Sequence, residues 1–331
     1  MTMRVMKART IADDLVDFLA NNHGCLARVH STFHHAVNLL IRQDELITLT
    51  NQGEIAPMGC MVDGNDIFKQ YLRPGDEVIL DMDRIVAANG AFSVYLCEAQ
   101  VWKSEIIADL DPRPLDELEQ TTHQLTEWLG QQPALGLLPL LAPLTNQGAN
   151  ILQPDNNIYS RYIANDLKDF TDAMLASDWE LALSITDRLL GFGMGSTPSC
   201  DDFLAANLLV LSLVERLNPA CYPWVGGFCN AVASKAERST TLISLNMLRH
   251  AGNGKMSRSH QRLVQTCLFG DTGDLKHLAN QVLQHGATSG GDFLLGLVCA
   301  LNWYRNSKMD HSKEGEEAWV ESMQSQPVSI L

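Results

Sequence analysis

The pattern of apolar and polar positions divides the chain into a strand-rich first part and a helical second part. From Cys25 to about Lys103, short runs of alternating character are separated by turn signals such as Arg73-Pro-Gly-Asp, which is the pattern of half-buried strands. After Asp111-Pro-Arg-Pro, apolar residues recur every three and four positions, as in amphipathic helices. We therefore predict an α+β protein: a small, mainly antiparallel β domain followed by a larger all-helical domain. The expected strands lie at residues 25–30, 38–42, 45–50, 77–82 and 92–102.

The same pattern sets the expected domain boundaries. Residues 1–24 are predicted to form an N-terminal helix, residues 25–110 the β domain and residues 111–306 the helical domain. The segment Pro133–Asn157 is rich in Pro, Gly and Asn, so we expect a loop or short helical turns there. Residues 307–331 are polar and acidic, and they are predicted to be a tail with little packed structure.

Composition narrows the function classes. The chain has 331 residues, 46% hydrophobic, and its 24 Lys+Arg against 39 Asp+Glu give a net charge of −15. Such a charge opposes non-specific binding to nucleic acid or an anionic membrane. The longest apolar run, Phe203–Val214, is shorter than the ~20 residues that cross a bilayer, and no signal peptide is evident, so we expect a cytoplasmic protein. Its eight scattered cysteines are predicted to be reduced thiols, not disulfides or zinc ligands.

Two segments share one design. Gly193-Met-Gly-Ser-Thr-Pro-Ser-Cys-Asp-Asp-Phe-Leu and His285-Gly-Ala-Thr-Ser-Gly-Gly-Asp-Phe-Leu each predict a glycine-rich turn that leads into an apolar helix. Asp202 and Asp292 both precede Phe-Leu, 90 residues apart. Free N–H groups at a helix start bind anions, and the spacing is neither that of a Walker A loop nor that of a dinucleotide fingerprint. We predict one ligand site from both segments, although ordinary helix capping would give the same residues.

A third segment, Lys235–Lys255, lies between these two in the sequence. Arg238 could pair with a carboxylate or phosphate in a bidentate manner, and Thr241 and Ser244 share a helical face. An ordinary cap with a solvated arginine remains the alternative. The complete set of expected anion-binding residues is Gly193, Gly195, Ser196, Thr197, Ser199, Asp201, Thr240, Thr241, Ser244, Gly286, Thr288, Ser289, Gly290 and His30.

Metal binding has little support in the sequence. His30-Ser-Thr-Phe-His-His has no acid at ligand spacing, and we expect His30 to line the domain junction at a strand end. Asp201 and Asp202 could bind Mg²⁺ beside a phosphate ligand, but adjacent residues do not share a helix face. No other cofactor is expected.

Jointly, these motifs resemble the AllH family of oxamate carbamoyltransferase subunits. The similarity covers roughly residues 25–302 and rests on residues 30–39, 193–204, 239–244 and 286–296. Cys200 and Ala206 stand where the family pattern has glycine, and both substitutions are compatible with a paralogue that has a different substrate.

The resemblance implies a cytoplasmic transferase subunit of anaerobic allantoin breakdown that interconverts oxalurate and phosphate with oxamate and carbamoyl phosphate. It also implies companion subunits, one of them similar to acyl-CoA synthetase proteins, and a small anionic substrate. Asp202, Arg238 and Asp292 would then be catalytic, with Arg238 neutralising the charge that develops in acyl transfer. The alternative is a non-catalytic subunit that binds a small carboxylate or nucleotide for assembly or regulation.

Overall fold

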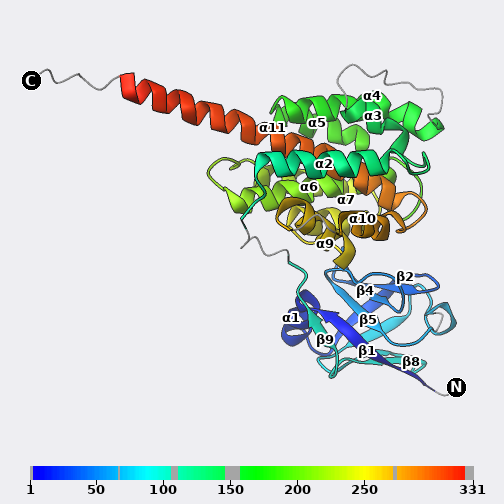
Figure 1. Cartoon of the computed structure of the whole chain (residues 1–331). Helices are drawn as coiled ribbons and strands as arrows, with labels where there is room; N and C mark the ends of the chain where they lie inside the picture. The colour runs from blue at the N-terminus through cyan, green and yellow to red at the C-terminus, as the bar shows by residue number, and fades with distance from the viewer. Residues whose placement is uncertain (1–2, 66–67, 106–110, 146–156, 271–273, 325–331) are drawn as a thin grey trace, which may run out of the picture.

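The computed structural model shows a β barrel beneath a cluster of helices (Figure 1). It describes residues 3–65, 68–105, 111–145, 157–270 and 274–324, with side chains as far as residue 309. The α+β architecture expected from the sequence is confirmed. No helix in these described ranges is both long and apolar enough to cross a membrane.

Nine strands form a single sheet in the first region, in the order β5-β4-β3-β2-β6-β7-β8-β1-β9. Their bounds are β1 Arg4–Ala12, β2 Cys25–Thr32, β3 Ala36–Ile41, β4 Glu45–Thr50, β5 Gly59–Val62, β6 Glu77–Leu80, β7 Arg84–Ala87, β8 Phe92–Tyr95 and β9 Gln100–Trp102. Strand β1 also pairs with β5, so strands β1 to β8 close into a barrel of eight strands, and β9 pairs with β1. The first half of β1 pairs with β8 and its second half with β9.

The pairing in the barrel is mixed. Strand pairs β1–β8, β1–β9 and β4–β5 are parallel, whereas the remaining pairs are antiparallel. Inward and outward positions alternate, as in β6, where Val78 and Leu80 are buried and Glu77 and Ile79 are exposed. The inward residues form their own hydrophobic core, which helix α1 (Asp13–Asn21) contributes to through Leu15 and Leu19.

The second region packs around helix α6. Residues 199–214 of this helix are all buried, as expected for a central helix that is apolar on every side. The other helices are α2 Leu115–Leu129, α3 Leu141–Thr145, α4 Ile158–Leu175, α5 Trp179–Leu189, α7 Val225–Ser239, α8 Leu242–Gly252, α9 Arg258–Leu268, α10 Leu275–Leu283 and α11 Ser289–Gln324, with short 3₁₀ turns at Phe68–Gln70 and Leu138–Leu140. Helix α6 itself spans Ser199–Leu217.

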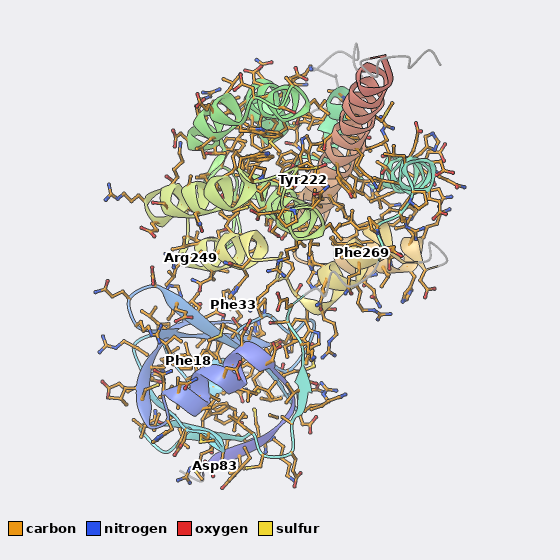
Figure 2. All side chains as sticks on the ribbon, turned by 90° about the vertical axis from the view of Figure 1, so that its left-hand side faces the viewer. Phe18, Phe33, Asp83, Tyr222, Arg249 and Phe269 are labelled. Atoms are coloured by element: carbon orange, nitrogen blue, oxygen red, sulfur yellow. The ribbon has the colours of Figure 1, made fainter. Side chains whose placement is uncertain are left out.

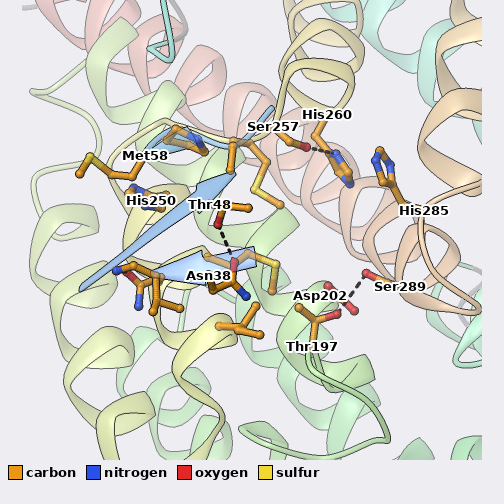
Figure 3. Close-up of a pocket in the computed structure, with 17 residues that line it drawn as sticks. Asn38, Thr48, Met58, Thr197, Asp202, His250, Ser257, His260, His285 and Ser289 are labelled. Atoms are coloured by element: carbon orange, nitrogen blue, oxygen red, sulfur yellow. Dashed lines mark hydrogen bonds between the residues drawn. The ribbon is translucent and has the colours of Figure 1, made fainter. Parts of the chain in front are cut away.

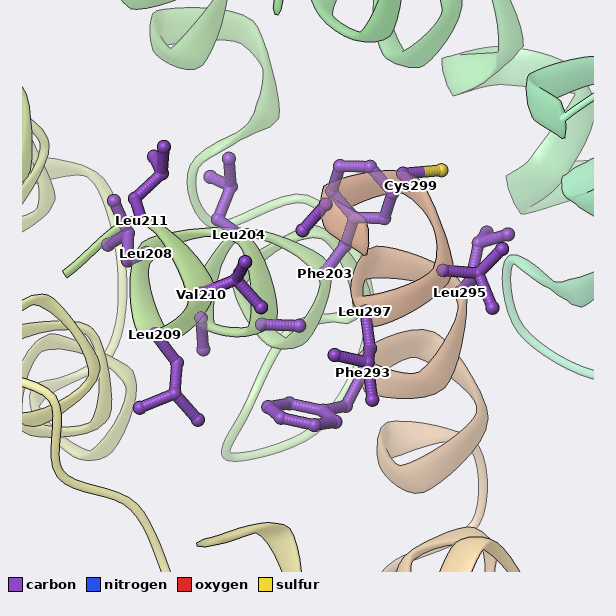
Figure 4. Close-up of a cluster of buried hydrophobic side chains, with 14 of the residues drawn as sticks. Phe203, Leu204, Leu208, Leu209, Val210, Leu211, Phe293, Leu295, Leu297 and Cys299 are labelled. Atoms are coloured by element: carbon purple, nitrogen blue, oxygen red, sulfur yellow. The ribbon is translucent and has the colours of Figure 1, made fainter. Parts of the chain in front are cut away.

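Helices α6 and α11 approach each other closely at one glycine. A Cβ atom at Gly296 of α11 would overlap the backbone of Phe203 in α6, so only glycine permits this distance. The Asn207 side-chain N–H donates to the Gly296 carbonyl at 3.4 Å and to the Phe203 carbonyl at 2.9 Å. Around the crossing, Leu208 and Phe293 belong to one continuous apolar cluster (Figure 4).

Helix α8 joins the helical region to the barrel. Asn246 Oδ1 accepts from the Leu46 N–H at 3.0 Å, and its Nδ2 donates to the Asp44 carbonyl at 2.9 Å. Arg249, which faces the barrel in Figure 2, pairs with the Asp44 carboxylate at 2.8 Å. Lys255 pairs with Asp14 of α1 at 2.6 Å. These contacts fix β4, the turn before it and α1 against the helical region.

The structure corrects the expected N-terminal helix. Arg4–Ala12 forms strand β1, and the helix is confined to Asp13–Asn21. Burial alternates along the first part of β1, which is the signal of a strand, and this strand closes the barrel. Strands β5 and β7, which the sequence did not predict, are only four residues long.

The expected C-terminal tail is also corrected. Helix α11 continues to Gln324, so residues 307–324 are helical, and residues 325–331 lie outside the described part. In the segment 133–157, the turn Leu138–Leu140 and helix α3 agree with the expected short helical turns. Residues 146–156 of that segment also lie outside the described ranges.

Replacing Gly296 by alanine tests the helix crossing. The added methyl group has no room beside Phe203, so we expect Gly296→Ala to lower the free energy of unfolding by about 1–3 kcal/mol, measured by urea denaturation. Gly227→Ala in α7 is the matched control, because nothing lies within 4 Å of its Cβ position. That control should gain about 0.5–1 kcal/mol from helix propensity. Equal stabilisation of both variants would contradict the close crossing.

Candidate functional site

A cavity of about 210 Å³ lies between the barrel and the helical region (Figure 3). Strands β3 and β4 and residues 56–58 form its barrel side, and the starts of α6 and α11 together with α8 and α9 form its helical side. Ligand sites commonly occur at such domain junctions. The cavity contains both predicted helix-start segments, through Thr197 and Asp202 of the first and His285 and Ser289 of the second.

The two helix starts exchange contacts reciprocally. Ser199 and Ser289 are the first residues of α6 and α11, and each precedes its aspartate by three positions. The Ser289 hydroxyl lies close enough to Asp202 to lower the pKa of its carboxyl, and the Ser199 hydroxyl does the same for Asp292. The repeated sequence design therefore corresponds to a repeated arrangement in space.

Asp202 is the acid of this group that faces the cavity. Its side chain is 2% exposed, and its Oδ2 has no hydrogen-bond partner within the described residues. Burial raises the pKa of the Asp202 carboxyl well above its ordinary value, and the hydroxyls of Ser289 and Thr197 oppose this only in part. The neighbouring carboxyls of Asp292 and Asp201 raise it further. Asp202 is therefore a buried acid that favours its neutral form.

Asp292 anchors a neighbouring turn. Its Oδ1 accepts from the Leu137 N–H at 2.6 Å, and Gly136 has a positive φ of 55° with its missing Cβ directed at this carboxyl. Burial raises the pKa of Asp292 to about 6, and the Leu137, Ser199 and Thr288 hydrogen bonds lower it by less. Asp292 does not line the cavity, so its position indicates a structural role.

Asp201 anchors the loops on either side. Its Oδ1 accepts from the Gly191 N–H at 2.8 Å, and its Oδ2 accepts from the Thr240 hydroxyl. Burial raises the pKa of the Asp201 carboxyl, although these hydrogen bonds and the Ser244 hydroxyl lower it. Asp201 and Asp202 thus have different partners, and across the described residues no three His, Cys, Asp or Glu side chains gather as a metal-ligand set. The geometry does not support Mg²⁺ at this pair.

Several N–H groups in the first turns of α6 and α11 already have backbone acceptors. In the first turn of α6, the Cys200 N–H donates to Phe192, and the N–H groups of Asp201 and Asp202 donate to Pro198. In α11, Gly290 and Asp292 donate to His285 and Thr288. These five N–H groups are therefore not open to an anion. Anion binding by the N–H groups around residues 193–199 and 286–289 stays a prediction. The groups that reach the cavity are side chains, above all the hydroxyls of Thr197 and Ser289.

Three glycines of the predicted site shape the loops. Gly193, Gly195 and Gly286 have positive φ angles of 125°, 105° and 59°, a conformation that side chains rarely adopt. A Cβ at Gly193 would overlap the Ser199 N atom, and one at Gly290 would overlap the backbone of Val282. Gly193 and Gly290 therefore permit close packing, and the positive φ angles of Gly193, Gly195 and Gly286 shape the loops before the two helices.

The segment between the two motifs is a capped helix start. The Thr241 hydroxyl accepts from the Ser244 N–H at 3.1 Å and donates to the Ser196 carbonyl at 2.6 Å. Arg238 is exposed in the last turn of α7 and does not line the cavity. His30 is also exposed, on β2, with Nδ1 at 3.2 Å from the Ser31 hydroxyl. The structure does not bring Arg238 or His30 together with the other predicted residues at this cavity.

The sequence analysis missed the histidines of the cavity. His260 Nδ1 lies 2.6 Å from the Ser257 hydroxyl, and the rings of His260 and His285 are 4.9 Å apart. Burial lowers the pKa of His260 and of His285, and it lowers the pKa of His250 to about 4. All three are therefore neutral near pH 7. No sequence motif contains His250 or His260. His285 begins the second glycine-rich motif, which was the one indication in the sequence that it lies near the site.

Comparison with protein families connects this arrangement to known proteins. The family model described as oxamate carbamoyltransferase subunit AllH matches residues 189–301, and the model of the AllH family N-terminal domain matches residues 7–101. The chain belongs to the AllH family. The first match contains both helix starts, and the second covers the barrel, so both parts that line the cavity belong to the AllH family pattern. No solved structure matches the chain.

The raised pKa of Asp292 predicts a pH-dependent effect of Asp292→Asn. Between the ordinary value of 3.8 and about 6, the folded protein retains a proton that the unfolded chain releases. Stability is therefore lost as pH rises through this window, by up to about 3 kcal/mol. Asparagine avoids this loss and can still accept from Leu137, so the variant should be more stable than wild type near about pH 7.5 and gain little near about pH 4.5.

Urea denaturation of both proteins at the two pH values measures this difference. Asp172→Asn, which removes an exposed carboxylate from α4, is the control, and it should change stability by less than about 1 kcal/mol at either pH. A gain from Asp292→Asn that does not depend on pH would contradict a protonated Asp292.

Proposed function

We propose that this chain is a subunit of a carbamoyltransferase. It binds oxamate, or its carbamoylated form oxalurate, in the cavity between the barrel and the helices. Membership of the AllH family supports the reaction class and the need for companion subunits. The observation that carries the proposal is that both helix starts with the repeated Asp-Phe-Leu motif lie at one cavity. In the proposed reaction, the carbamoyl group is transferred between oxamate and phosphate, with oxalurate and carbamoyl phosphate as the corresponding carbamoyl compounds.

The cavity has the properties that a small polar ligand requires. Its volume of about 210 Å³ exceeds that of a single water molecule several times over. Asp202 Oδ2 and His285 Nδ1 are buried without a hydrogen-bond partner in the described structure, and such groups are costly unless a ligand or water satisfies them. The hydroxyls of Thr197 and Ser289 lie beside Asp202. These four side chains form the proposed binding group.

Other polar side chains of the cavity have structural partners. Asn38 Oδ1 accepts from Thr48 and its Nδ2 donates to Ser31, while Asn246 holds the barrel against α8. They support the wall of the site. Recognition is therefore assigned to the helix-start residues and His285.

A non-catalytic subunit that binds the same small acid is the second candidate. Arg238, the cation to which the resemblance assigned charge neutralisation, lies outside the cavity. A catalytic cation would then have to come from a companion subunit. Measuring carbamoyl transfer by the assembled subunits distinguishes the two candidates. If the chain is non-catalytic, substitutions in this cavity change ligand binding but not the rate of carbamoyl transfer.

Removing a single hydroxyl tests the binding group. We expect Ser289→Ala and Thr197→Val each to weaken oxamate binding about fivefold, because one hydrogen bond contributes roughly 1 kcal/mol. Calorimetry on the chain together with its companion subunits measures the affinity, and a coupled assay measures carbamoyl transfer. Ser184→Ala, which removes an exposed serine hydroxyl from α5, is the matched control and should bind oxamate as wild type does. Absence of oxamate and oxalurate binding in every subunit combination would refute the proposal.

A further inference from the structure

The ligand-facing end of the cavity is a buried carboxyl group without a counter-charge. Asp202 is 2% exposed, lines the cavity and leaves Oδ2 without a partner in the described structure. Asp201 and Asp292 lie close enough to oppose its ionisation. Among the described residues that line the cavity there is no lysine or arginine, and its three histidines favour their neutral forms.

These surroundings disfavour a negatively charged ligand group beside Asp202. A phosphate or carboxylate there would meet three buried acids and no cation, and like charges in a buried site repel strongly. At the start of α6, the N–H groups of Cys200, Asp201 and Asp202 donate to Phe192 and Pro198, so these three do not stabilise an anion. An uncharged ligand group is therefore favoured at this end.

A primary amide complements a carboxyl group in both protonation states. The protonated acid donates its O–H to the amide carbonyl and accepts from the amide N–H, and the carboxylate still accepts from the N–H. The hydroxyls of Ser289 and Thr197, beside Asp202, can donate and accept as well. Burial raises the pKa of Asp202 and so favours the protonated form, which offers the two-bond pairing.

We propose that Asp202 binds the uncharged carbamoyl end of the ligand, and that the charged group of the ligand points away from the helix starts. This inference deepens the proposed function and rests on its assignment of the cavity as the ligand site. It makes Asp202 a specificity-determining residue that selects a primary amide against an acid of the same shape.

Matched pairs of small ligands test this selection on the full chain. Oxamate and oxalate differ by one amide in place of one carboxylate, and acetamide and acetate differ in the same way. Ligand-observed NMR titration should show the amide of each pair binding at least about tenfold more tightly than its acid, a difference of about 1.4 kcal/mol. Inorganic phosphate is the further anionic probe and should bind no better than acetate.

Two substitutions assign the selection to Asp202. Asp202→Asn keeps the shape and can pair with an amide, so it should bind oxamate within about threefold of wild type. Asp202→Leu removes both hydrogen-bonding atoms and should weaken oxamate binding at least about tenfold while changing oxalate binding less. Thermal unfolding checks that both variants fold. If Asp202→Leu does not fold, the oxamate affinity of Asp202→Asn alone tests the role of Asp202. Asp172→Asn on α4 should retain the wild-type preference for amides.

Each outcome supports or overturns the inference. Acids or phosphate that bind as tightly as the amides overturn it, as do an Asp202→Asn variant that binds oxamate more than about tenfold weaker and the absence of binding by every probe. If carbamoyl transfer depends on Ser289 but the ligand pairs bind alike, the inference fails and the proposed function stands. If the amides bind selectively but no subunit combination transfers a carbamoyl group, the proposed function fails alone.

Discussion

The close crossing of α6 and α11 is the constraint on which the site depends. Gly296 lets the two helices meet at Phe203, and this contact brings their first turns together although they are distant in sequence. Ser199 then reaches Asp292, and Ser289 reaches Asp202. A side chain at Gly296 would separate the helices, and the reciprocal contacts beneath the cavity would be lost. The apolar cluster around the crossing supplies the burial that stabilises it.

That burial also determines the chemistry of the cavity. Three acids sit in a helical core. Asp201 accepts from the Gly191 N–H and the Thr240 hydroxyl, and Asp292 accepts from the Leu137 N–H through one oxygen, so both serve as anchors. Asp202 alone presents a carboxyl oxygen to the cavity wall. The barrel completes this wall because Asn246 and Arg249 hold β4 and the preceding turn against α8. The result is a mainly apolar cavity with one buried carboxyl group in its wall and no lysine or arginine among the described residues that line it.

The sequence predicted the architecture and the helix starts because both leave local signals. Alternation and turn residues indicated β2, β3, β4 and β6, and the repeated Asp-Phe-Leu motif indicated the two segments that meet at the cavity. Barrel closure depends on the long-range pairing of β1 with β5, which no local pattern encodes. Arg238 was inferred from its residue type, whereas its exposure at the end of α7 depends on the tertiary packing. His260 was missed because an isolated histidine in a helical pattern carries no signal until the fold places it beside Ser257 and His285.

A crystal structure of the chain with its companion subunits and oxamate tests the central claim most directly. The account predicts oxamate in the cavity between the barrel and the helices, within hydrogen-bond distance of Ser289, Thr197 and Asp202, with its carboxylate directed away from these residues. Oxamate bound elsewhere, for example at the exposed Arg238, with this cavity unoccupied by ligand, would contradict it.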